Sequence, residues 1–129
     1  NIKYQANQTL DEQLYVAAMS EINLLGSECF RNLNRITLAE FFRSPELASS
    51  TLAHLGQQTD GLHTWINDAI KDGRLKNVDA DYAAKQFLGL IKASAFWPQL
   101  LMNQTFPSAV QQKIIADDTV FMFLARYRA

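Results

Sequence analysis

The side chains best suited to metal chemistry are Asp60 and His63, which stand three residues apart. On a helix this spacing places a carboxylate and an imidazole on one face, within reach of one metal ion. Helical two-metal sites need that pattern twice, with two further carboxylates. Here it occurs once, and His54 lies nine residues before His63, on the opposite side of the helix. A helical-bundle metalloenzyme is therefore only an alternative, and no metal or other cofactor is expected.

No group of residues has the spacing of a catalytic site. Cys29 is the only cysteine and has no histidine near it in the sequence, so we expect a small buried hydrophobe. Asp117 and Asp118 are adjacent and point in different directions on a helix, so they cannot act as a pair. The sequence also lacks a glycine-rich phosphate loop. The chain is not expected to be an enzyme.

Polar side chains interrupt the apolar stripes of three predicted helices. They are Glu21, Asn34, Thr37, Thr59 and His63. A buried polar group costs free energy unless it finds a hydrogen-bond partner. These residues therefore either pair with their own neighbours or act as anchors in a mostly apolar pocket for a small molecule. Both interpretations remain open at this point.

Aromatic side chains complete the predicted ligand site. Phe41 lies on the same helix as Asn34 and Thr37, while Phe87 and Trp97 share the face opposite a polar stripe. Aromatic residues at helical spacing are more often part of a core, which is the alternative here too. We expect an apolar or aromatic ligand, and Glu21 would permit a cationic one.

Composition limits the classes of protein that fit. The chain has 129 residues, 48% of them hydrophobic, which suits one domain with a proper core. The net charge of -1 argues against a nucleic-acid-binding surface, which needs basic residues. No apolar run reaches the ~20 residues of a membrane span. A cytoplasmic location is expected, and because the sequence begins at Asn1 we expect a piece of a longer protein.

Residues that start and stop helices divide the chain into about five helices. The expected spans are 10–25, 27–43, 45–72, 79–101 and 107–129. Thr9 opens a capping-box pattern, Pro45 follows a capping serine, and Asp79 caps the fourth helix. Gly73 ends the third helix, and Pro98 is expected to kink the fourth. The predicted fold is an all-α bundle.

The fourth predicted helix is apolar on most of its circumference. Its narrow polar stripe consists of Asp81, Lys85, Lys92 and Gln99. A helix that is apolar on most sides must be covered from more than one direction. The last helix also contains an apolar run at 120–125, so we expect a second copy of the chain to cover both helices. The predicted dimer contact comprises Tyr82, Gly89, Ala93, Phe96, Leu100, Val110, Ile114, Phe121 and Met122.

Three segments, taken in order, resemble the C-terminal regulatory domain of TetR-family transcriptional regulators. They are FFRSPELA at 41–48, AIKDGRL at 69–75, and Asp79 followed by AAKQFLGL at 83–90. The family pattern is a phenylalanine-rich helix ending at Pro-Glu-Leu, a long helix ending in a Gly-x-Leu turn, and then a helix with Ala-Ala-x-x-Phe-x-Gly-Leu. The resemblance covers about residues 10–101.

This resemblance implies a domain that binds a small effector and dimerises through its last two helices as a four-helix bundle. In such regulators, many of them repressors, an N-terminal helix-turn-helix domain binds operator DNA, and the effector changes the spacing of the two DNA-binding domains. The present sequence contains no helix-turn-helix, so contact with DNA is expected only through a domain outside it. The expected partners are a second copy and an unidentified effector, with a ligand-free interaction module as a further alternative.

Overall fold

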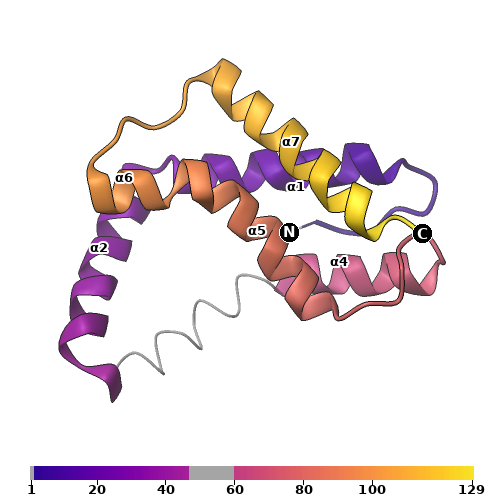
Figure 1. Cartoon of the computed structure of the whole chain (residues 1–129), viewed down its shortest axis with the longest axis horizontal. Helices are drawn as coiled ribbons and strands as arrows, with labels where there is room; N and C mark the ends of the chain where they lie inside the picture. Colours follow the sequence, from indigo (N-terminus) through magenta and orange to yellow (C-terminus); the bar gives the residue numbers. More distant parts are fainter. Residues whose placement is uncertain (1, 47–59) are drawn as a thin grey trace.

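The computed structural model describes residues 2–46 and 60–129, which form six helices (Figure 1). They are α1 (Leu10–Leu25), α2 (Glu28–Arg43), α4 (Asp60–Lys71), α5 (Ala80–Ala95), α6 (Trp97–Met102) and α7 (Ala109–Tyr127). The described residues contain no strand, only an isolated antiparallel bridge between Leu75 and Arg128. None of the helices described here is long and apolar enough to cross a membrane. The predicted all-α class is confirmed.

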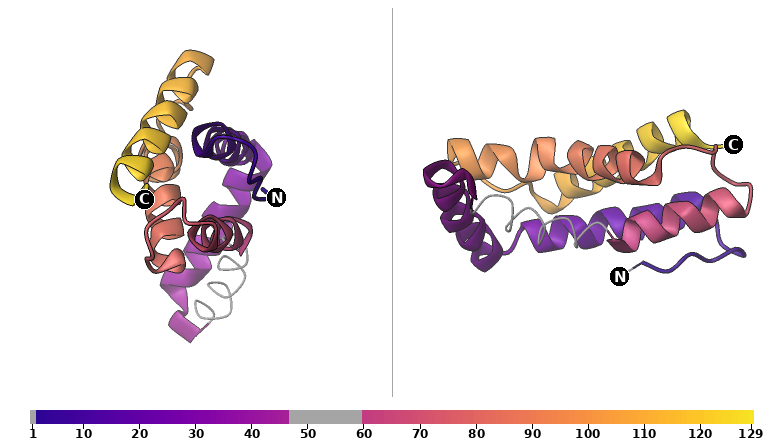
Figure 2. Two further views of the ribbon diagram at one scale, coloured as in Figure 1. Left: turned by 90° about the vertical axis from the view of Figure 1, so that its right-hand side faces the viewer. Right: turned by 90° about the horizontal axis from the view of Figure 1, so that it is seen from below.

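The helices form two layers, with α1 and α4 in one and α5, α6 and α7 in the other (Figure 2). Helix α7 packs along α1, and α5 contacts α1, α4 and α7. Helix α2 projects from one end, near α6 (Figure 1). The largest fully buried side chains are those of Trp65, Phe87, Leu10, Leu14, Ile22, Ile66 and Ile91. The core therefore lies between the two layers.

Side-chain caps fix most helix ends where the sequence predicts them. The Thr9 hydroxyl accepts a hydrogen bond from the Glu12 backbone N–H at 3.1 Å, and the Asp79 carboxylate accepts from two backbone N–H groups of α5. Gly73 ends α4 with a φ of 74°, a conformation that favours glycine. Helix α7 begins at Ala109, two residues later than predicted, because Ser108 caps it in a reciprocal capping box with Gln111.

The third predicted helix agrees with the structure where residues are described, whereas the fourth is divided into two helices. Helical structure resumes at Pro45 and Glu46, as predicted, and α4 ends near the expected position; residues 47–59 lie outside the described part. The fourth helix is broken at Phe96, whose φ and ψ of -141° and -64° separate α5 from α6. Pro98 then lies in the first turn of α6, where its missing N–H needs no partner.

The break at Phe96 also moves Gln99 into the interior. Gln99 is only 3% exposed, so its assignment to the polar stripe is wrong. Its amide donates to the backbone oxygens of Ser94 and Thr105, at 3.0 and 3.5 Å. A continuous helix would have turned this side chain outward, whereas α6 follows a new axis.

Gln13 is a buried polar residue that connects three parts of the fold. It is 5% exposed. Its side-chain oxygen accepts from the Gln5 backbone N–H at 2.8 Å and from the Trp65 indole N–H at 3.0 Å. Its amide donates to backbone oxygens of Gln5, Gln8 and Thr9. One side chain on α1 thus holds the N-terminal segment, residues 2–9, against α4.

Arg74 and Tyr4 hold the same segment from the other side. The Arg74 guanidinium donates to the Gln8 backbone oxygen at 2.7 Å and to the Tyr4 hydroxyl at 3.1 Å. The Tyr4 hydroxyl donates to Asp72 at 2.6 Å, and the Tyr4 ring meets the Trp65 ring edge-to-face at 5.7 Å. The N-terminal segment is therefore an integral part of the domain.

Replacing Gln13 by alanine should destabilise the protein by about 2–4 kcal/mol, because several buried donors and acceptors lose their partner. The unfolding midpoint in urea, at constant slope, measures this. Gln104→Ala, at an exposed glutamine, is the matched control and should change stability by less than about 0.5 kcal/mol. If the two substitutions changed the free energy of unfolding equally, the hydrogen bonds of Gln13 would make no net contribution to stability.

Candidate functional site

A groove of about 460 Å³ opens between α1, α4 and α5, and we call it the inner groove. Its described lining residues are Ile2, Val16, Ala17, Ser20, Glu21, Leu24, Gly61, Leu62, Phe87 and Leu88. The volume falls within the range of about 300–1,000 Å³ that small-molecule sites occupy. The lining is mostly apolar with few polar groups, as such sites usually are.

The floor of the inner groove is part of the rigid core. Leu62 and Phe87 are 7% and 1% exposed, and the Phe87 ring meets the Phe123 ring of α7 edge-to-face at 5.4 Å. Val16 and Leu24 on α1 are exposed and form the rim. Ala17 lies between them on the same helix, and its small side chain leaves space above the floor. The groove therefore has a buried base and an exposed rim.

Glu21 is the polar group that stands out in this lining. Its side chain is half-buried, and within the described residues it forms no hydrogen bond or ion pair. Burial raises the pKa of the Glu21 carboxyl, and the positive charge of Lys92 on α5 partly offsets that rise. The groove thus contains a half-buried carboxylate that has no bonded partner in the described part of the chain.

Of the predicted ligand-binding residues, the structure brings Glu21 and Phe87 together at the inner groove. Asn34 and Thr37 instead donate to backbone oxygens of their own helix, Asn34 to Phe30 at 2.8 Å and Thr37 to Leu33 at 2.9 Å. This is the arrangement in which a polar residue pairs with its neighbours. Neither residue is among the described lining of the groove.

The remaining predicted ligand residues are dispersed. Phe41 packs edge-to-face on Phe42, and Trp97 packs in the same way on Phe96 with 43% of its surface exposed. His63 is half-buried on α4 but is not part of the described lining. Thr59 lies outside the described residues. The predicted set therefore does not form one site within the described part of the chain.

Most lining residues on α1 could have been found from Glu21 alone. Ala17 and Leu24 stand four residues before it and three after it, so helical geometry places them beside it. The sequence gives no comparable signal for Ile2, which reaches the groove because Gln13 and Arg74 fold the N-terminal segment back onto the domain.

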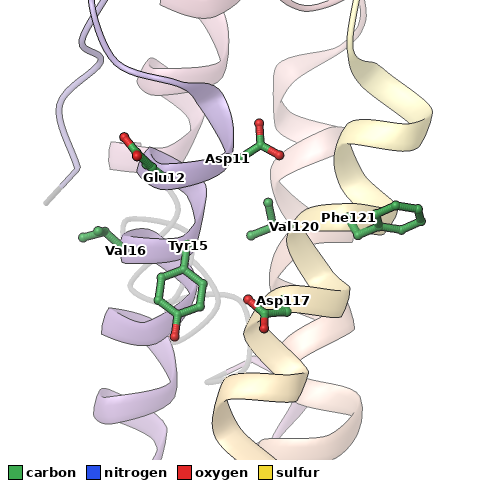
Figure 3. A pocket seen from close by; sticks show the side chains of 7 residues that line it. All are labelled: Asp11, Glu12, Tyr15, Val16, Asp117, Val120 and Phe121. Carbon is green, nitrogen blue, oxygen red and sulfur yellow. The ribbon is translucent and has the colours of Figure 1, made fainter.

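A second groove, the outer groove, runs between α1 and α7 and has a volume of about 470 Å³ (Figure 3). It is lined by Asp11, Glu12, Tyr15, Val16, Asp117, Val120 and Phe121. It is more open than the inner groove, and the Phe121 ring points away from α1 (Figure 3). Asp11 is already paired with Arg128 at 2.8 Å. The outer groove is the weaker candidate for a ligand site.

The described residues contain no group of three or more potential metal ligands. The acidic residues of the outer groove therefore do not form such a group either.

Cys29 is exposed on α2, so the prediction that it is buried is wrong. Helix α2 packs on the rest of the domain mainly near its start, which leaves much of its surface open.

The residues predicted to contact a second copy fall into two groups. On α5, Tyr82, Gly89 and Ala93 are exposed, and a Cβ added at Gly89 would meet nothing within 4 Å. On α7, four large apolar side chains are each more than half exposed: Val110, Ile114, Phe121 and Met122. Phe96 and Leu100 are each 9% exposed, so the chain itself covers them and little of either is left for a partner.

Comparisons with known proteins agree with this architecture. Residues 12–129 match the family model described as the C-terminal domain of AefR-like transcriptional repressors. A solved TetR-family transcriptional regulator from Pseudomonas syringae pv. tomato is 32% identical, with a TM-score of 0.89 over 98% of this chain. A protein from Mesorhizobium loti assigned to the same family has the same fold, with 19% identity and a TM-score of 0.86 over 96% of this chain. The comparison with curated proteins returned no match.

The present chain spans 65% and 62% of the lengths of those two solved proteins. The family match covers nearly the whole sequence, and the structural match includes both helical layers. The chain belongs to the TetR family of transcriptional regulators, as a C-terminal domain of the AefR-like type.

Proposed function

We propose that this domain binds a small apolar or aromatic effector in the inner groove and dimerises through α5 and α7. Effector binding would control DNA binding by an N-terminal domain that is not part of this chain, most simply as a repressor. The observation that carries the proposal is the inner groove itself, a mostly apolar recess of ligand size whose described lining has one ionisable side chain. A ligand that binds one arrangement of the helices better than another would shift the population between them.

The position of Ile2 suggests how the groove communicates with the N-terminal side of the chain. Ile2 lines the groove, and the residues that follow are held by Gln13 and Arg74. A ligand in the groove therefore touches the segment that leads towards the N-terminus. A ligand that displaces Ile2 would strain the hydrogen bonds that hold Tyr4 and Gln5. Ligand binding and the position of the N-terminal segment are therefore coupled.

The exposed apolar surface of α5 and α7 supports dimerisation. Val110, Ile114 and Phe121 are spaced four and seven residues apart, so they lie on one face of α7, and Tyr82, Gly89 and Ala93 lie on one face of α5. Large exposed apolar patches mark interaction sites. The resemblance to TetR-family regulators points to the same two helices as the dimer contact.

Ala17→Trp should abolish binding of a neutral apolar probe, because the indole ring would fill the space above Leu62 and Phe87. The probe is N-phenylnaphthylamine, whose fluorescence rises in apolar surroundings, and we expect the dissociation constant to increase by about tenfold or more. Asn23→Trp adds the same side chain at an exposed position on α1 outside the described groove lining, and should leave binding unchanged. Equal binding by both variants would rule out the inner groove as the probe site and would favour a ligand-free interaction module.

Gly89→Leu should weaken self-association by about tenfold or more, because a bulky side chain would separate two closely packed helices at the centre of the contact. Within one chain the leucine side chain has open space, and glycine is a poor helix former, so folding should not suffer. Sedimentation equilibrium over a dilution series measures the effect.

Two further variants sharpen the dimer experiment. Ile114→Glu places a charge in the exposed stripe of α7 and should also weaken the dimer. Ala39→Leu adds an apolar side chain at an exposed site on α2, away from both helices, and should have no effect. A dimer that is unchanged in both Gly89→Leu and Ile114→Glu would place the contact elsewhere.

A further inference from the structure

We propose that the inner groove recognises an apolar or aromatic molecule that carries one positive charge, with the carboxylate of Glu21 as its counter-ion. This inference rests on the proposed function, because it names the chemistry of the effector that the same groove would bind. Ser20, an exposed residue of α1, is the other polar side chain among the described lining residues.

The charge pattern of the groove is the first argument. Glu21 is the only ionisable side chain among the described lining residues, and all the others except Ser20 are apolar or glycine. Among the described lining residues, a ligand lying against Leu62, Phe87 and Leu88 therefore meets one formal charge, which is negative. That arrangement disfavours an anionic ligand and gives a cationic one a unique orientation.

The second argument is that none of the residues described in the structure forms a hydrogen bond or ion pair with this carboxylate. The ion pairs among the described residues are Arg43–Glu40, Lys85–Asp81 and Arg128–Asp11. Lys92 is the cation whose field reaches Glu21, but its ammonium lies over the Phe96 ring, 5.5 Å from the ring centre. A partly dehydrated carboxylate without a partner costs free energy. A bound cation would recover that cost, because charges attract more strongly where water is excluded.

The protonation behaviour of Glu21 provides an independent check without any ligand. Because burial raises the pKa of this carboxyl above its ordinary value of 4.5, the folded protein retains the proton to higher pH than the unfolded chain. The unfolding free energy contributed by this group therefore falls as pH rises through the interval above 4.5. Glu21→Gln should be more stable than the wild type at pH 7, and this difference should vanish below pH 4.5. A variant less stable than the wild type at pH 7 would show that the carboxylate has a stabilising partner, which contradicts the second argument.

Competition against bound N-phenylnaphthylamine tests the charge preference directly. Three competitors share one alkyl chain: decyltrimethylammonium is cationic, decyldimethylphosphine oxide is neutral and decanesulfonate is anionic, all used below micellar concentrations. For the wild type we expect the cation to compete about tenfold better than the neutral compound, with the anion weakest. Glu21→Gln should bring the cation and the neutral compound to similar affinity. Glu12→Gln, at an exposed glutamate on the same helix, should preserve the preference.

Charge reversal gives the sharpest outcome. Glu21→Lys should reverse the order, so that decanesulfonate competes best. The counter-ion role of Glu21 is wrong if the probe binds the wild type but the three competitors bind equally well. It is also wrong if Glu21→Gln still prefers the cation. In both cases the inner groove remains a ligand site. If neither the probe nor any competitor binds the wild type, this inference and the proposed function both fail.

Discussion

Helix α5 must be covered on more than one side, and this requirement organises the rest of the domain. Ala83, Ala84, Phe87 and Ile91 are at most 1% exposed, because α1 and α4 pack on one side of α5 and α7 on the other. Fully burying a side chain such as those of Phe87 or Ile91 stabilises the fold by about 1.5–3 kcal/mol. The small alanines allow the neighbouring helices to approach closely. The outer stripe with Tyr82, Gly89 and Ala93 stays uncovered within one chain.

The two proposed functions arise on different sides of this same helix. Phe87 and Leu88 take part in the inner groove, while Gly89 and Ala93 face outward. Because Phe87 also packs on Phe123 of α7, the floor of the groove is in direct contact with a helix that carries four exposed large apolar side chains. A ligand on the floor and a partner on the outer stripe would therefore act on one rigid element.

Local signals predicted the helices well and the tertiary contacts poorly. Thr9, Asp79 and Gly73 mark helix ends through interactions with their own neighbours, so the sequence is sufficient to locate them. Gln13 and Gln99 look like surface residues in the sequence. Gln13 is buried with a partner, Trp65, that lies far away along the chain, and Gln99 with a partner, Ser94, on the other side of the helix break at Phe96. Glu21 is identifiable because it is a polar exception on an apolar helical face, and Phe87 because it lies opposite a polar stripe. Asn34 and Thr37 are polar exceptions too, but they satisfy their hydrogen bonds within their own helix.

Hydroxyl-radical footprinting can show whether a second copy covers the exposed faces of α5 and α7. Met122 on α7 and Met102 on α6 are the same residue type with similar exposure in one chain, 53% and 62%. In concentrated protein we expect Met122 to oxidise much more slowly than Met102, and we expect dilution to make the two rates similar. Equal rates of oxidation at every concentration would mean that no second copy covers this face of α7.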